Sequence, residues 1–457
     1  MANFYSAAKK VKKIGKQQQV TIESLDQSLS GVTHIHNKVV FVPGALPNEQ
    51  VAIQIVDEQK KYAKASLVEV LTPSPQRIAP SCPHFEACGG CQVQHLNIDE
   101  QLAAKEQGLK RRFAKLTKPS HWFEAVASQP WRYRRRGRIG VHVEKNKQLR
   151  LGFRQQGSSD IVNIERCDVF AKPFDQIFKP LYQLIDNLDA REEIGHVEVI
   201  AAANRNVTLF RVTAKLAQSD IDALTDFANE HQLTVLLETN NGTIMPLPDH
   251  DMPTLDYQLG KHQVSFTPGN FIQVNAEVNQ EMVTKAVEWL DIQHTDTVLD
   301  LFCGVGNFSL ALAKNAQLVI GVEGVKEMAE QATVNAQRAG INNAQFYHCN
   351  LAQPLIEQQW FGSKLRKKVD KILLDPARDG APDICRQLSQ LQPSKIVYVA
   401  CDAASLERDS KEIIAQGYQV AKICALDMFP QTSHVESMAL FVKSKTKPKR
   451  PKKGLLR

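Results

Sequence analysis

Short hydrophobic runs alternate with polar turns along the first part of the chain. Between residues 20 and 71 the β-type runs VTIESL, NKVVFVPG, EQVAIQIV and ASLVEVL recur about every ten residues, which predicts a small β-barrel. The next stretch, TPSPQRIAPSCP, has four prolines in twelve residues. Because proline interrupts both helices and sheets, we expect a domain boundary there.

Beyond residue 92 the pattern of apolar positions is mixed. A basic helical stretch over 105–115 is followed by the strand patterns VEVIAAA and VTLFRVTA, a helical pattern over 219–231 and the strand pattern LTVLLET. Helical and strand periods that follow one another in this irregular order predict an α+β insert domain.

From residue 266 onward strands and helices alternate strictly. The strand patterns TVLDLF, LVIGVE, AQFYHCN, KILLDP and IVYVAC are separated by helical ones. This order predicts an α/β fold with a Rossmann-like, doubly wound and mostly parallel sheet, which binds ligands at the carboxyl ends of its strands. The predicted domains are the barrel at 12–72, the α+β insert at 73–265, the sheet domain at 266–445 and a basic tail at 446–457.

The composition, 43% hydrophobic and 23% charged residues, is that of a soluble globular protein. No apolar run approaches the ~18 residues of a membrane helix, and the N-terminal residues have no hydrophobic signal core, so we expect a cytoplasmic protein without membrane contact. The net charge of +7 lies in the two ends, because residues 1–16 hold five lysines, residues 443–457 hold eight basic residues, and neither has an acid. Such ends suit phosphate neutralisation, although solvated termini give the same pattern.

A glycine-bearing turn in DTVLDLFCGVGNFSLALA indicates a cofactor loop. A strand ends at Leu301, the turn contains Gly304 and Gly306, and a helix starts near Asn307, so that the backbone can pass close to a ligand. The next strand ends in Glu323, 19 residues after Gly304, where a carboxylate can bind ribose hydroxyls. A dinucleotide site would need a third glycine, so the pattern favours S-adenosylmethionine (AdoMet) over NAD.

The strand IVYVAC brings Cys401 to the carboxyl edge of the predicted sheet, where the methyl group of AdoMet would lie. A lone cysteine is most often a buried structural residue, but this position favours catalysis. Carbon 5 of uracil is too weakly nucleophilic to attack a methyl sulfonium, whereas thiolate addition at carbon 6 makes carbon 5 reactive. The carbon 5 proton must then be removed, and Glu436 in HVESMALF is the candidate base.

The turn DPAR at 375–378 helps to choose between methylation reactions. Methylases of exocyclic amino groups usually have an aromatic residue at this turn, and cytosine-C5 methylases have a Pro-Cys pair. This chain has neither of them. The turn therefore favours uracil as the target base.

Four cysteines indicate a metal site. Cys82, Cys88 and Cys91 lie within ten residues of one another, and Cys167 is a distant fourth. Because a protein without an export signal keeps its thiols reduced, clustering favours metal binding over disulfides. The spacing alone leaves zinc and an iron-sulfur cluster both open.

The run WRYRRRGRIG combines five arginines with Trp131 and Tyr133. Such a mixture can bind phosphates and stack on bases, so we expect the run on an RNA-binding surface. An amphipathic strand with a solvated face is the alternative. A uracil inside structured RNA would have to leave its stack to reach a buried catalytic residue.

Six segments together resemble the RNA uracil-C5 methyltransferase family along nearly the whole chain: FTPGNFIQVN, DLFCGVGNFSL, GVE, LLDPARDGA, VYVAC and HVESMALF. The barrel and the cysteine segment resemble the branch that modifies uridine 1939 of 23S rRNA, which joins a TRAM-type barrel to an iron-sulfur region. The tRNA uracil-54 branch lacks both features. The resemblance implies an AdoMet-dependent enzyme that acts on 23S ribosomal RNA, and we expect it to be a monomer.

The resemblance also implies roles for individual residues. Cys401 corresponds to the nucleophile and Glu436 to the base. Contacts with AdoMet are implied for Gln273, Phe302, Asn307, Glu323, Asn350 and Asp375. A [4Fe-4S] cluster that ties the post-barrel loop to the insert domain is implied on Cys82, Cys88, Cys91 and Cys167. Many relatives have Ser-Cys-Asn-Pro around the nucleophile, whereas this chain has Ala-Cys-Asp-Ala, and the added carboxylate of Asp402 would raise the thiol pKa.

Two other functions are compatible with parts of this pattern. A non-catalytic RNA-binding assembly factor could hold AdoMet as a structural ligand, but it would need neither Cys401 nor Glu436. The same reaction on another rRNA or tRNA uridine is also compatible, because RNA selectivity lies in the shape that the outer domains recognise.

Overall fold

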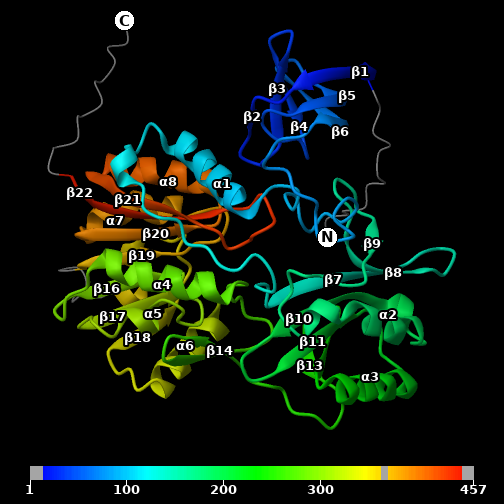
Figure 1. Cartoon of the computed structure of the whole chain (residues 1–457). Helices are drawn as coiled ribbons and strands as arrows, with labels where there is room; N and C mark the ends of the chain where they lie inside the picture. Colours follow the sequence, from blue (N-terminus) through cyan, green and yellow to red (C-terminus); the bar gives the residue numbers. More distant parts are fainter. Residues whose placement is uncertain (1–13, 362–368, 445–457) are drawn as a thin grey trace, which may run out of the picture.

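The computed structural model describes residues 14–361 and 369–444. Most of the two basic ends, including the predicted tail at 446–457, lies outside the described residues. Figure 1 shows three bodies: a small β-rich domain, a second sheet with its own helices, and a larger α/β domain. Within the described ranges no helix is long and apolar enough to span a membrane.

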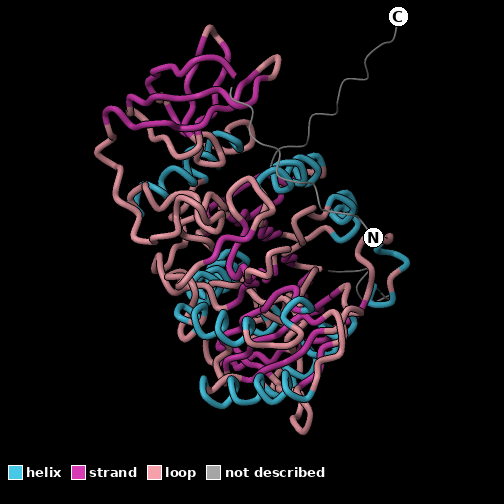
Figure 2. The backbone as a smooth tube through the Cα atoms, turned by 90° about the vertical axis from the view of Figure 1, so that its right-hand side faces the viewer, coloured by secondary structure: helices cyan, strands magenta, loops and turns pink. Residues whose placement is uncertain are grey.

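The N-terminal domain is a six-stranded sheet that curls around one small core, which confirms the predicted β-rich domain. Its strands, in the spatial order β1-β5-β6-β4-β3-β2, are β1 (Ile14–Thr21), β2 (Ser24–Leu25), β3 (Gly31–Ile35), β4 (Lys38–Val42), β5 (Gln50–Glu58) and β6 (Tyr62–Thr72). Val40, Val51 and Ile53 fill its core. In Figure 2 this domain projects from one end of the molecule.

The insert domain is a seven-stranded sheet covered by helices. In the spatial order β13-β12-β11-β10-β7-β8-β9, its strands are β7 (Arg136–Val143), β8 (Leu149–Arg154), β9 (Ile161–Asn163), β10 (Ile194–Ala201), β11 (Asn206–Val212), β12 (Thr234–Glu238) and β13 (Ile244–Pro246). Helices α2 (Phe178–Asp186) and α3 (Gln218–His231) pack on it through Phe178 and Phe227. The α+β character predicted for this region is confirmed.

The C-terminal sheet has the order β18-β17-β16-β19-β20-β22-β21, in which only β22 runs against the others. Its strands are β16 (Thr297–Leu301), β17 (Leu318–Glu323), β18 (Ala344–His348), β19 (Lys371–Leu374), β20 (Lys395–Ala400), β21 (Tyr418–Leu426) and β22 (Glu436–Lys443). Its helices are α4 (Ala276–Leu290), α5 (Ser309–Leu312), α6 (Lys326–Arg338), α7 (Pro382–Leu391) and α8 (Ala403–Ala415). This is the predicted Rossmann-like sheet.

Helices cover both faces of the C-terminal sheet, so neighbouring residues of one strand enter different cores. Val298 packs with residues of α4 and α5, whereas Leu299 packs with residues of α7 and α8. Strands buried on both faces form nearly continuous hydrophobic runs, as TVLDL and KILL do here. The hairpin β14 (Leu255–Leu259) and β15 (His262–Phe266) joins the core on the α4 side.

Helix α1 (Ile98–Phe113) connects the N-terminal domain with the C-terminal sheet. Its residue Leu109 is buried in the core shared with α7 and α8, and Figure 1 shows the helix beside α8. On its other side Arg112 donates hydrogen bonds to the side-chain oxygen of Gln27 in the N-terminal domain. One helix thus fixes the small domain near the edge of the large sheet.

Candidate active site

The carboxyl ends of the parallel strands meet at one edge of the C-terminal sheet. Asp375 follows β19 and Cys401 follows β20. Because β22 runs in the opposite direction, its first residue, Glu436, comes to the same edge. The pairing of Ala400 with Ser437 sets Glu436 next to Cys401.

Cys401 and Glu436 open into one pocket of about 440 Å³. The other walls of this pocket come from distant parts of the chain: Gln273 precedes α4, Arg378 follows β19 and His434 precedes β22. Gly89, Gly90 and Gln92 of the cysteine segment, residues 82–93, close one side. Side chains of four different loops therefore surround the thiol and the carboxylate.

A second pocket, of about 210 Å³, lies on another side of Cys401 and reaches Gln27 and Ser28 of the N-terminal domain. Phe271, whose side chain is 64% exposed, lines the first pocket. The thiol of Cys401 can therefore be reached from two sides, past the exposed ring of Phe271 and through the second pocket beside the β-rich domain.

Burial changes the acidity of the carboxylates at this edge. It raises the pKa of Glu436 to about 7. It also raises the pKa of Asp375 well above the usual range, and the charges of Glu436 and Asp300 add to the effect, while a hydrogen bond from the Gln273 side chain opposes it. Glu436 is thus a carboxylate that exchanges its proton near neutral pH.

Cys401 is exposed to the pocket, but partial burial and the charges of Glu436 and Asp375 raise the pKa of its thiol to about 11. Asp402 adds the smallest contribution in the same direction. Its carboxylate is the N-cap of α8 and accepts a hydrogen bond from the Ser405 backbone N–H at 2.8 Å. The unusual aspartate therefore has a capping role that limits its influence on the thiol.

The glycine-bearing turn after β16 has the backbone geometry of a ligand loop. Gly304 and Gly306 have φ angles of +58° and +95°, and Phe302 has +70°, which is uncommon for a residue with a side chain. Glu323 accepts hydrogen bonds from the backbone N–H groups of Gly304 at 2.9 Å and Val325 at 3.0 Å. The carboxylate thereby holds the turn close to the end of β17.

Two residues predicted to contact AdoMet have other partners. The side chain of Asn307 accepts a hydrogen bond from the Tyr257 hydroxyl at 2.9 Å and exchanges two with Asn279 of α4. Asn350 is exposed after β18, and its side-chain oxygen accepts from the Ala352 backbone N–H. Gln273, Asp375, Cys401 and Glu436 lie together at the edge, whereas these two asparagines point into local hydrogen-bond networks.

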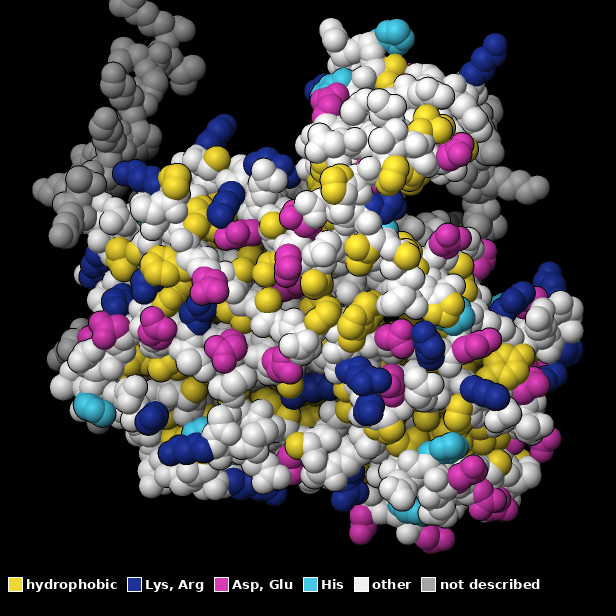
Figure 3. Space-filling model, viewed as in Figure 1, with side chains coloured by type: hydrophobic (Ala, Val, Ile, Leu, Met, Phe, Trp, Pro, Cys, Tyr) yellow, Lys and Arg dark blue, Asp and Glu magenta, His cyan; other side chains and the backbone are white. Residues whose placement is uncertain are grey.

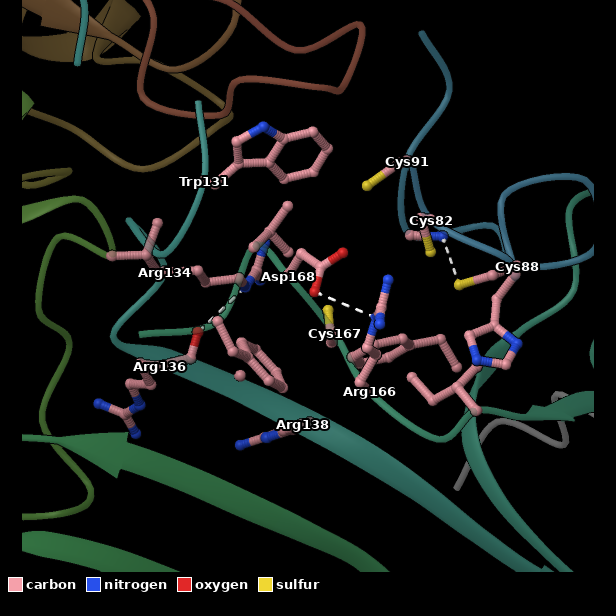
Figure 4. Close-up of a pocket in the computed structure, with 18 of the residues that line it drawn as sticks. Cys82, Cys88, Cys91, Trp131, Arg134, Arg136, Arg138, Arg166, Cys167 and Asp168 are labelled. Atoms are coloured by element: carbon pink, nitrogen blue, oxygen red, sulfur yellow. Dashed lines mark hydrogen bonds and ion pairs between the residues drawn. The ribbon is translucent and has the colours of Figure 1, made fainter. Parts of the chain in front are cut away.

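The four cysteines of the predicted metal site line a single cavity of about 560 Å³ (Figure 4). Cys82, Cys88 and Cys91 come from one loop and Cys167 from the segment that faces it. Gly89 brings the loop against β8, where a Cβ atom would lie 2.8 Å from the carbonyl oxygen of Arg154. All nine cysteines are free thiols.

Burial and the closeness of the other thiols raise the pKa values of cysteines in this cavity. Burial raises the pKa of Cys91 to about 11 and that of Cys167 to about 12, and the neighbouring cysteines contribute in the same direction. In the described part of the chain no three His, Cys, Asp or Glu side chains are arranged to hold a metal ion.

The arginine-rich run, which we expect on an RNA-binding surface, is only partly exposed. Only Arg132 and Arg138 are exposed, and each forms an ion pair. Arg135 is buried: it lies over the ring of Tyr257 and donates a hydrogen bond to the backbone oxygen of Gln273 at 2.7 Å. On the face shown in Figure 3, basic and acidic side chains are interspersed. These arginines therefore make ion pairs and hydrogen bonds within the protein.

Comparison with known families shows which family the chain belongs to. The model of the family described as tRNA (Uracil-5-)-methyltransferase matches residues 97–444, and that of the TRAM domain matches residues 11–68. The chain belongs to the uracil-5 methyltransferase family. Two members of this family, both called 23S rRNA (uracil(1939)-C(5))-methyltransferase RlmD, are similar over 96% of this chain and 99% of their own length: 43% identical in Shewanella sediminis and 44% in Shewanella piezotolerans.

Solved structures show the same family fold. The tRNA (uracil-54, C5)-methyltransferase of Pyrococcus abyssi, crystallised with S-adenosyl-L-homocysteine, superposes with a TM-score of 0.73 at 23% sequence identity. The match covers 93% of this chain and 100% of that protein. The fold of this uracil-5 methyltransferase family member is therefore shared almost from end to end.

Several residues of the pocket had no signal in the sequence. Arg378 and His434 lie inside motifs, but nothing in their spacing indicates that both line the pocket with Cys401. Tyr257, which bonds Asn307, belongs to a segment without a chemical motif, and Gln92 follows the last clustered cysteine without any sign that it lines this pocket. An alignment of family members is the kind of information that could have singled them out.

Proposed function

We propose that this protein transfers a methyl group from AdoMet to carbon 5 of the uridine that corresponds to position 1939 of 23S rRNA. The observation that carries the proposal is the pocket in which Cys401 lies beside Glu436, a buried carboxylate whose pKa is raised to about 7. A nucleophile and a neutral-pH base in one pocket are the two groups that uracil-C5 methylation needs. The names of the RlmD relatives support the RNA target.

Cys401 acts as the nucleophile in this reaction. Its thiolate forms a bond to carbon 6 of the uracil, and the electron pair of the 5,6 double bond moves to carbon 5 and the carbonyl oxygen. AdoMet, a consumed substrate, supplies the methyl group that carbon 5 receives. Cys401 then stays bound to carbon 6 until the carbon 5 proton is removed.

Glu436 acts as the base of the second half-reaction. It takes the proton from carbon 5, the electron pair restores the double bond, and the bond between carbon 6 and the Cys401 sulfur breaks to release thiolate. A base works best when its pKa lies near the working pH. The buried position of Glu436 provides this match.

The sheet edge suits AdoMet because several carboxylates are buried close together there. Asp300, Asp375 and Glu436 are buried there, and their mutual repulsion contributes to the raised pKa of Asp375. A cationic ligand such as a sulfonium relieves this repulsion. The resemblance implies Gln273, Phe302, Asn307, Glu323, Asn350 and Asp375 as the residues that contact AdoMet, and we keep this set as part of the proposal.

We infer that Cys82, Cys88, Cys91 and Cys167 hold a [4Fe-4S] cluster. Four sulfur donors around one cavity, with burial and mutual repulsion opposing free thiolates, suit a positively charged iron-sulfur group. When bound, the cluster would supply cross-links between the cysteine loop and the insert domain. Its role is structural, because the reaction involves no electron transfer.

Incubation with tritiated AdoMet and a 23S rRNA fragment that contains an unmodified uridine 1939 tests the proposal. We expect tritium in 5-methyluridine at that position, and no incorporation when cytidine replaces the uridine. Label in another nucleoside would contradict the reaction, and equal label in the cytidine-substituted fragment would contradict the target. Binding that weakens steeply with salt is expected from phosphate contacts.

A further inference from the structure

The loop that carries the chain from β21 into Glu436 is held by residues from the N-terminal third of the sequence. We call residues 427–435 the β21–β22 loop. Lys105 of α1 donates to the Asp427 carboxylate at 2.7 Å and to the backbone oxygen of Phe429 at 3.1 Å, and both charged side chains are buried. The hydroxyl of Tyr133 donates to the backbone oxygen of Pro430 at 2.9 Å.

Gln431 is the centre of this arrangement. It is buried and has a φ angle of +68°, a conformation that residues with a side chain adopt only when their surroundings impose it. Its partner is Gln101 of α1, which is 1% exposed. The Gln431 backbone N–H donates to the Gln101 side-chain oxygen at 3.1 Å, and the Gln101 amide donates to the Gln431 side-chain oxygen at 3.0 Å.

The cysteine segment also forms hydrogen bonds with the β21–β22 loop. The backbone N–H groups of Gln92 and Val93 both donate to the carbonyl oxygen of Gln431, at 3.1 and 3.2 Å. The Gln92 side-chain oxygen accepts from the backbone N–H of Ser433 at 3.4 Å, and its amide donates to the carbonyl oxygen of Gly89 between two cysteines. The amide of Gln101 also donates to Val93 and thereby ties α1 to this segment.

Little freedom remains between Gln431 and Glu436. The hydroxyl of Thr432 donates to the backbone oxygen of Phe429 at 2.8 Å and accepts from the backbone N–H of His434 at 3.2 Å. Beyond His434 the chain enters β22 at Glu436, whose position is then fixed by the strand pairing. The backbone of the whole loop is therefore set from outside the C-terminal sheet.

We propose that Gln101 is a positioning residue for Glu436: by imposing the left-handed conformation of Gln431, it aims the carboxylate of Glu436 at the carbon 5 proton. This inference rests on the proposed function. It assigns control of proton removal to α1 and the cysteine segment, which lie outside the C-terminal sheet, whereas Cys401 is carried by the end of β20.

The two half-reactions can be separated experimentally with the full-length chain. On unmodified RNA, slow proton removal leaves the methylated RNA covalently bound to Cys401, and denaturing gel electrophoresis measures this adduct. On RNA with 5-fluorouridine at the target, the fluorine cannot leave as a cation, so the rate of adduct formation reports attack and methyl transfer alone. The ratio of the two measurements does not depend on the fraction of folded protein.

Two variants test Gln101. Gln101→Glu keeps the oxygen that accepts from Gln431 and loses the amide donors, whereas Gln101→Met loses both. Gln54→Met is the matched control, because Gln54 is a buried glutamine of the N-terminal domain that donates to the Gly15 backbone oxygen. Glu436→Gln serves as the reference for complete loss of the base.

We expect both Gln101 variants to break down the adduct on unmodified RNA at least about tenfold more slowly than wild type. This loss is a part of the roughly 10²–10⁴-fold rate increase that a general base contributes. The effect should be larger for Gln101→Met. The rate on 5-fluorouridine RNA should stay within about twofold, and the Gln54 control should show wild-type breakdown. Wild-type breakdown in both Gln101 variants, or an equal fall in both measurements, would overturn the inference. If wild type itself formed no adduct with 5-fluorouridine RNA, the proposed function would fail instead.

Discussion

The edge of the C-terminal sheet and the cysteine cavity position their functional side chains in different ways, the first by strand pairing and the second by the packing of loops. At the edge, Cys401 directly follows β20 and Glu436 is the first residue of β22, and the pairing of these two strands brings them together. In the cavity, Cys91 and Cys167 lie on segments without regular structure whose approach depends on packing between domains. The comparison teaches that strand register can bring two reacting groups together even though long-range hydrogen bonds hold the loop before one of them, whereas loop-borne ligands depend throughout on packing between domains.

The largest effect is expected at the thiol. Cys401→Ala should abolish both methylation and adduct formation while leaving the melting temperature near that of wild type, because the side chain faces the pocket. Cys385→Ala, a buried cysteine of α7, is the control and should lower stability but keep activity. Residual adduct in the Cys401 variant, detected on a denaturing gel, would assign the nucleophile elsewhere.

Glu436→Gln should lower turnover by about 10²–10⁴-fold, the usual contribution of a general base. Attack by Cys401 needs no carboxylate, so the covalent RNA adduct should accumulate rather than disappear. Single-turnover kinetics with gel analysis measures both quantities. A variant that loses adduct and product together would indicate that Glu436 serves binding or folding.

The cavity is tested by Cys88→Ser, with Cys385→Ser as the control. After anaerobic purification we expect wild type and the control to contain iron and broad visible absorbance, and the Cys88 variant to lose most of both. Its melting temperature should also fall, because the cross-link between the cysteine loop and the insert domain is lost. An unchanged iron content would contradict the cluster assignment.

The pH dependence separates Glu436 from the thiol. Breakdown of the isolated adduct should rise about tenfold per pH unit below 7 and level off above 8, because only the ionised carboxylate accepts a proton. The folded-state pKa of about 7 lies above the ordinary value of 4.5. The Glu436 contribution to stability should therefore fall as the pH rises from 4.5 to 7, and thermal melts of wild type and Glu436→Gln should show this difference. A flat rate profile would contradict the assignment.

The smallest effect is expected at Asp402. Asp402→Asn keeps an N-cap oxygen for Ser405 and removes one negative charge beside the thiol, so the pKa of Cys401 should fall slightly. Adduct formation on 5-fluorouridine RNA should become faster by less than about tenfold, the equivalent of one pKa unit. A slower reaction would mean that the aspartate contributes directly to the attack.

The sequence predicted the architecture, which is confirmed, and it pointed to Cys401 and Glu436 as a catalytic pair, whose roles stay predictions. Hydrophobic periodicity identified the three structural classes, and strand-end positions identified Cys401 and Glu436, because both are local properties of the chain. The expected exposure of the arginine run was wrong for Arg135, since its burial over Tyr257 depends on a contact between distant segments. The AdoMet contacts, the cluster ligands and the domain boundaries stay predictions.

By itself the sequence determined which residues end the parallel strands of the C-terminal sheet, and so it determined that Asp375 and Cys401 meet at one edge. Glu436 reaches this edge because β22 runs in the opposite direction. Only the tertiary structure decided how the base is held. Gln101 and Gln431 are 330 residues apart, and neither lies in a pattern that marks it. Their hydrogen bonds form only after α1 has packed on the C-terminal sheet, which local periodicity cannot specify.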